Sequence, residues 1–116
     1  MSQAWSEPTE LIPRPEQTPT ALKAALSVVA PERLPEMVDG QTGAMAEAIA
    51  SGSVQPIRSF VAHWAAVVEI ERHPATAREY HRANYLANHA ESVEDCRRHA
   101  RTVAELYRTA HAAVNG

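Results

Sequence analysis

Residues 56–77 constrain the fold of this chain more than any other stretch. Their sequence, PIRSFVAHWAAVVEIERHPATA, opens with Pro56, which suits the first turn of a helix because no N–H donor is needed there. Apolar residues then recur at helical spacing along one face: Ile57, Phe60, Val61, Trp64, Val67 and Val68. This pattern predicts an amphipathic helix whose apolar face lies in the core.

The opposite side of this helix is small rather than charged. It is formed by Ser59, Ala62, Ala66 and Ile70. Because small side chains let a second helix come close, we predict a central helix that is covered on two sides. Arg58, Glu69 and Arg72 are the side chains expected in solvent. Pro74 disfavours helical geometry in the residue before it, so a kink or tight corner should follow the helix.

The composition fits an all-α domain. Hydrophobic residues make up 45% of the 116 residues, but aromatic residues only 5%, and runs of β-branched residues are absent. A chain of this size can bury a core without a metal or a disulfide. We therefore predict a small single-domain helical bundle of about four to five helices in residues 19–116. Residues 1–18 are rich in proline, and we expect them to form a flexible, disordered arm.

Apolar side chains within this arm have two interpretations. Trp5, Leu11 and Ile12 either fold back onto the domain or anchor the arm to a partner, since tryptophan is favoured at binding hot spots. The first interpretation is the simpler one, and the sequence alone does not decide between them.

Prolines and capping residues divide residues 19–116 into helices. Thr18 and Ser92 are suited to cap the first and the last helix, and the expected helical ranges are 19–30, 35–51, 56–73, 74–90 and 92 onward. Gly40 and Gly43 each weaken the second helix by about 1 kcal/mol relative to alanine. We expect that helix to be broken or frayed in its middle.

The last helix carries an apolar seam with alternating spacings of three and four residues. Its members are Val93, Cys96, Ala100, Val103, Tyr107, Ala110 and Val114. This heptad pattern predicts shallow-angle packing against another helix, either inside the bundle or in a dimer. The alanine and cysteine positions are small for a free-standing coiled coil, which favours the internal alternative. Cys96 would then be buried and inert.

The sequence shows no constellation that predicts an enzyme, a cofactor site or a metal site. Helical metal sites pair ligands three or four residues apart and draw others from elsewhere. The nearest arrangement combines His81, His89, Asp95 and His99, and ordinary surface histidines explain it better. His63, beside Trp64 in the central helix, is interpreted as a hydrogen-bonded histidine at the margin of the core.

Arg97, Arg98 and Arg101 form a basic cluster on the last helix. Acidic residues lie close by at ion-pair spacing, and the net charge of the chain is −3, so nucleic acid is not favoured as a partner. The single cysteine and the lack of a leader or a spanning apolar run predict a cytoplasmic protein with no membrane association.

Three stretches carry a family resemblance: TPTALKAAL at residues 18–26, PERLPEM at 31–37 and the central stretch at 56–77. On these the chain resembles a family of short, uncharacterised helical proteins, a domain of unknown function from high-GC actinomycete genomes. The resemblance covers roughly residues 18–90 and implies a small helical fold. It supplies no activity, cofactor or catalytic residue. DGQTG at residues 39–43 departs from the more continuous helix that the family implies.

Taken together, these patterns predict a non-enzymatic helical protein that acts through protein–protein interaction, as a regulatory or antitoxin-like partner. The partner is another protein or a second copy of the chain. Two alternatives stay open: a ligand- or metal-binding helical bundle, and a dimeric DNA-binding regulator.

Overall fold

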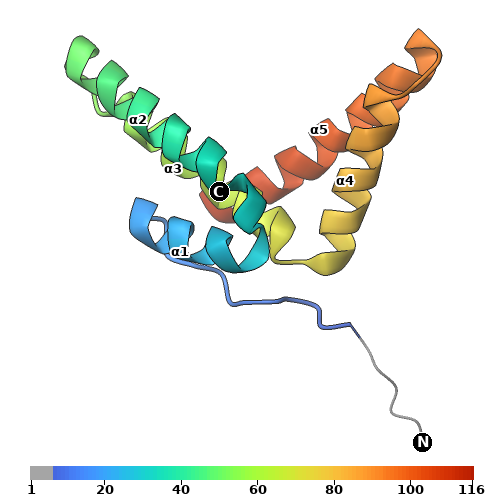
Figure 1. Cartoon of the computed structure of the whole chain (residues 1–116), viewed down its shortest axis with the longest axis horizontal. Helices are drawn as coiled ribbons and strands as arrows, with labels where there is room; N and C mark the ends of the chain where they lie inside the picture. The colour runs from blue at the N-terminus through green and yellow to red at the C-terminus, as the bar shows by residue number, and fades with distance from the viewer. Residues whose placement is uncertain (1–6) are drawn as a thin grey trace, which may run out of the picture.

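The computed structural model describes residues 7–116, which form five α-helices (Figure 1). They are α1 (Pro19–Val29), α2 (Leu34–Ser51), α3 (Gln55–Glu71), α4 (Pro74–Asn88) and α5 (Val93–Asn115), with a 3₁₀ turn at Pro31–Arg33 between α1 and α2. No strand occurs in this part of the chain. The predicted all-α bundle is confirmed, and Trp5 lies outside the described residues.

The helices form two hairpins that diverge from a common vertex (Figure 1). The first arm of this V is the pair α2 and α3, and the second arm is the pair α4 and α5, while α1 lies beneath the first arm. α3 crosses α5 at the vertex, where the C-terminal end of α5 also lies. Because the two arms diverge, the molecule is far from spherical, with extents of 57 × 42 × 27 Å. Beyond the vertex, α4 lies beside α5, whereas the helices of the other arm, α2 and α3, do not (Figure 1).

The C-terminal half of α3 is the centre of the fold, as predicted. Phe60 and every residue from Trp64 to Glu71 are buried, and Ala66 is 0% exposed. The expectation that Glu69 and Arg72 lie in solvent is wrong, because they are only 7% and 4% exposed. Both are covered by the segment that precedes α1.

Two apolar clusters meet along α3. The larger one joins Leu22 and Leu26 of α1 and Met37 of α2 to Trp64 and Val68. The smaller one packs Ala66 and Ile70 against Ala110 of α5, with partly buried tyrosines and Val114 around them. The small side chains at 66 and 110 allow the close crossing of α3 and α5. The first cluster holds the first arm and α1 together, and the second holds the two arms at the vertex.

The helix ends follow the predicted chemistry. Oγ1 of Thr18 accepts a hydrogen bond from the amide of Ala21 at 3.1 Å, and Oγ of Ser92 accepts one from the amide of Asp95 at 3.1 Å. These bonds fix the starts of α1 and α5. At the other end of the first arm, Gly52 ends α2 with φ +71°, a conformation that favours glycine.

α2 is continuous, so the predicted break near its glycines is wrong. A Cβ atom at position 40 would lie 3.5 Å from the ring of Phe60 and 3.7 Å from the indole nitrogen of Trp64. These are ordinary van der Waals distances, so α2 packs directly against both aromatic rings of α3 at this position. Packing against these aromatic rings compensates for the weak helix propensity of glycine.

Residues 7–18 contain no helix, as the prolines predicted, and they run in an extended path to α1 (Figure 1). We call residues 7–17 the strap. Its backbone is tied to the domain by a hydrogen bond of 2.7 Å from the amide of Leu11 to the carbonyl of Arg72. Ile12 packs against the larger core cluster. Of the two interpretations of the apolar arm residues, contact with the domain therefore applies to Ile12.

Candidate functional site

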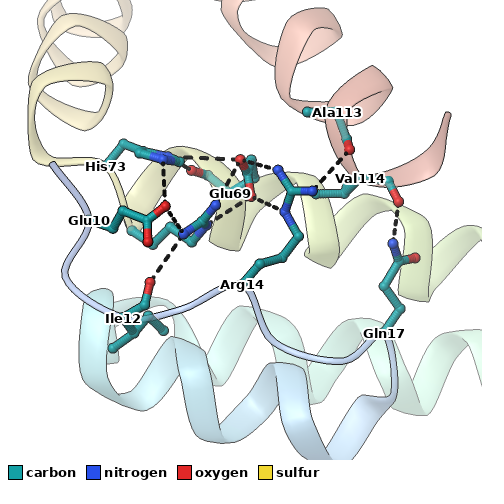
Figure 2. Close-up of polar contacts among 9 residues, drawn as sticks. Glu10, Ile12, Arg14, Gln17, Glu69, His73, Ala113 and Val114 are labelled. Atoms are coloured by element: carbon teal, nitrogen blue, oxygen red, sulfur yellow. Dashed lines mark hydrogen bonds and ion pairs between the residues drawn. The ribbon is translucent and has the colours of Figure 1, made fainter.

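Two features stand out: an ion cluster beneath the strap and the exposed N-terminal half of the apolar seam of α5. In the cluster, two guanidinium groups converge on one carboxylate (Figure 2). Arg14 donates to Glu69 at 3.0 and 2.9 Å, and Arg72 donates to it at 2.9 and 3.3 Å. Burial by itself would raise the pKa of Glu69, but the hydrogen bonds from both arginines outweigh it and lower the pKa to about 2.

Further contacts make this cluster a structural clasp for the strap. Arg72 also pairs with Glu10 at 2.9 Å and donates to the carbonyl of Ile12 at 3.1 Å. Arg14 donates to the carbonyl of Ala113 at 3.3 Å, and Gln17 donates to the carbonyl of Val114 (Figure 2). The strap thereby connects the C-terminal turns of α3 and α5. These partners satisfy the buried charges, so we assign the cluster to stability.

A second buried carboxylate, Glu71, lies on the other side of α3. Its oxygens are 2.9 and 3.1 Å from Nε2 of His81, and Arg33 approaches to 3.8 Å. The guanidinium of Arg33 lies over the ring of Trp64, 5.3 Å from its centre. His81, one of the candidate metal ligands, is therefore a partner for Glu71.

The other candidate ligands are also separated. His89 stacks on Tyr85 with ring centres 4.0 Å apart, and Asp95 pairs with Arg98 at 2.8 Å. His99 lies against α4 beside Glu79 and Arg82. Within residues 7–116, no three His, Cys, Asp or Glu side chains are close enough together to hold a metal ion. The structure thus does not assemble His81, His89, Asp95 and His99 into one site.

The vertex between the arms is a polar hollow. It is lined by Gln55, Arg58, Ser59, Ala62 and His63 from α3 and by Tyr107 and His111 from α5. Nδ1 of His63 is 2.7 Å from the hydroxyl of Tyr107, so this histidine is hydrogen-bonded. Burial, then the charge of Arg33, lowers the pKa of His63, and burial raises that of Tyr107. The imidazole and the phenol remain neutral near pH 7 and bridge the two arms.

The apolar seam of α5 is packed along only half its length. Tyr107, Ala110 and Val114 contact α3 in the smaller core cluster. In contrast, Val93 is 66% exposed, and Cys96 and Ala100 are exposed as well. The prediction of an internal seam is confirmed for its C-terminal half and wrong for its N-terminal half, including the predicted burial of Cys96. The reason is that α3 crosses α5 at the vertex and then diverges from it (Figure 1).

The surfaces on either side of this seam differ. On one side of the seam, the residue before each seam position packs toward α4. These residues are all partly buried: Asp95, His99, Thr102 and Leu106. On the other side of the seam, the residues that follow the seam positions are exposed. They are Arg97, Arg101, Ala104 and Arg108. We define Val93, Cys96, Ala100 and Val103, together with Arg97 and Arg101, as the open face of α5. Of the predicted basic cluster, Arg97 and Arg101 belong to this face, whereas Arg98 pairs with Asp95.

No family model, curated protein or solved structure matches this chain, so the family resemblance stays a prediction. Among the helices described here, none combines the length and the apolar character that crossing a bilayer requires.

Proposed function

We propose that this chain is a non-enzymatic protein that acts by binding another protein on the open face of α5. The observation that carries the proposal is the heptad seam that extends beyond its packed half. Its spacing is that of a helix–helix contact, yet no helix within residues 7–116 covers Val93, Cys96 and Ala100. A protein partner that covers this strip removes its apolar surface from water, which stabilises the complex by about 25 cal/mol for each Å² buried.

The shape of the molecule supports the same function. A groove between α2 and α3 offers a second surface to which a partner helix can bind. That groove is lined by small residues of α2, including Gly40, Gly43 and Ala44, and by Phe60 and His63 of α3. A backbone can come close to such a surface because few side chains project from it.

The flanking arginines suit a protein partner with acidic residues. Arg97 and Arg101 border an apolar strip, and arginine at the border of a buried contact contributes bidentate hydrogen bonds to carboxylates. The net charge of the chain is −3, so it has no overall positive charge of the kind that favours binding to nucleic acid. A regulatory, antitoxin-like role in the cytoplasm is the form of this proposal that the sequence favours.

Site-specific photo-crosslinking in cells tests the proposal. A benzophenone amino acid at Ala100 should give a discrete adduct with a protein, because the position lies in the middle of the open face. The same residue at Ala24, exposed on α1, is the matched control and should give none. Equal, diffuse labelling from both positions, or no adduct from Ala100, would contradict the proposed function.

A further inference from the structure

The polar hollow at the vertex lies between helices of different arms, α3 and α5 (Figure 1). Its volume is about 390 Å³, near the lower end of the range of small-molecule sites, roughly 300–1,000 Å³. Beside it, the side-chain amide of Asn115 on α5 donates a hydrogen bond to the carbonyl of Ala62 on α3 at 3.1 Å. This bond holds the two walls together, so the crossing of the helices creates a hollow of a size that suits a small ligand.

The polar side chains that line the hollow can all donate hydrogen bonds. Besides His63 and Tyr107, they are the guanidinium group of Arg58, the hydroxyl of Ser59 and the amide of Gln55 on α3, and the imidazole of His111 on α5. No carboxylate is found among the described residues of this lining. Hydrogen bonds to a charged group are the strongest ones, so such a lining favours an anion.

Arg58 carries a positive charge that no acid of the described chain neutralises. No ion pair joins it to a carboxylate of residues 7–116, whereas acidic partners are found for Arg14, Arg33, Arg72, Arg78 and Arg98. A second cation, Arg108, lies on the adjoining surface of α5 beside His111. The positive charge at the hollow is thus available to a ligand.

Two acids of α2 lie near His63 but outside the hollow. Glu36 pairs with Arg33 at 3.2 Å, and the charges of these two residues act on His63 in opposite directions. Glu47 lines the groove between α2 and α3 and is not part of the lining between α3 and α5. Neither acid therefore competes with a ligand for Arg58.

The bond between His63 and Tyr107 leaves the second imidazole nitrogen for a ligand. Nδ1 of His63 is 2.7 Å from the phenol oxygen, and both groups are neutral near pH 7 because burial lowers the pKa of His63 and raises that of Tyr107. When the phenol donates this bond, the imidazole proton lies on Nε2. That nitrogen can then donate to an anion.

We propose that the vertex hollow binds a phosphate group, as free phosphate or as part of a small phosphate ester. Donors come from both walls, and the tetrahedral phosphate presents oxygens to both, whereas a carboxylate has only two oxygens in one plane. Arginine pairs bidentately with phosphate, which carries a charge of roughly −1.5 to −2 at pH 7 when it is an ester. This site is separate from the open face of α5, so it goes beyond the proposed function.

Nuclear magnetic resonance of the imidazole groups tests the inference. Inorganic phosphate is titrated into the full chain at pH 7 and constant ionic strength, with acetate as the reference anion. The signals of His63 and His111 should shift with phosphate, with a dissociation constant of about 1 mM or lower, and not with acetate. R58Q should weaken binding by at least about tenfold. The matched control R82Q removes the same charge from an exposed position on α4 and should bind as the wild type does.

A second titration, with phenyl phosphate, distinguishes the two sources of the phosphate group. Tighter binding than that of inorganic phosphate indicates an ester, and equal or weaker binding indicates free phosphate. Three results would each overturn the inference: no saturable shift with either compound, an equal response to acetate, or an R58Q variant that binds as tightly as R82Q. Crosslinking from Ala100 tests the proposed function separately, so each can fail without the other.

Discussion

Arg72 is the side chain whose loss should affect the fold most. It is 4% exposed, pairs with Glu69 and Glu10 at 2.9 Å each, and donates to the carbonyl of Ile12 at 3.1 Å. Removing one partner of a buried ion pair destabilises a protein by about 3–5 kcal/mol, because the other charge is left buried without compensation. Arg14 still holds Glu69 in the variant R72A. We therefore expect the lower end, about 3 kcal/mol.

Urea denaturation followed by circular dichroism measures this loss, with R78A as the matched control. Arg78 pairs with Glu7 of the strap in full contact with solvent, where screening leaves an ion pair with little effect on stability. The R72A variant should also speed amide exchange at Leu11. The side chain of Arg72 holds Glu10 and the carbonyl of Ile12, and without these contacts the strap should separate more often from the carbonyl of residue 72, which accepts the Leu11 amide. An unfolding free energy for R72A no lower than that of R78A would refute the assignment of the cluster to stability.

Three further outcomes follow from single side chains. The pKa of Glu69 is lowered to about 2 from an ordinary 4.5, so its contribution to folding stability is complete above pH 4.5 and is lost as the pH falls toward 2. In the variant E69Q, the urea midpoint should therefore change less with pH over that range than it does in the wild type. G43A should raise stability by about 1 kcal/mol, since nothing lies within 4 Å of the added Cβ, whereas G52A should lower it because φ is +71° there; urea midpoints again report both.

Local chemistry in the sequence was sufficient to predict where the helices begin and end, although the break expected within α2 is absent. Thr18 and Ser92 cap α1 and α5 through bonds to residues three positions on, and such bonds depend on nothing distant. The spacing of apolar residues in α3 likewise identified the central helix. Both signals lie within one helix and its first turn.

The burial of Glu69 and Arg72 was beyond local reasoning. Arg14, which covers Glu69, lies 55 residues earlier in the chain, and no spacing rule connects the two. Charged side chains are rarely buried unless paired, so a sequence without the partner in view favours solvent for both.

The open face of α5 was missed for a similar reason. Heptad spacing identifies an apolar face, but it does not say which helix lies opposite or how far along the contact extends. That depends on the angle at which α3 crosses α5. The small residues at Cys96 and Ala100 favoured an internal seam, but both are exposed in the structure.

Cys96 offers the most direct test of whether the open face of α5 is occupied in the cell, because it is the only cysteine of the chain and lies on that face. The measurement is the rate at which its thiol reacts with a maleimide, in dilute purified protein and in intact cells expressing the protein at its natural level. We predict rapid labelling in the dilute protein and labelling at least tenfold slower in cells, corresponding to about 1.4 kcal/mol of protection. Equal rates in the two settings would contradict the proposal that this surface binds a protein.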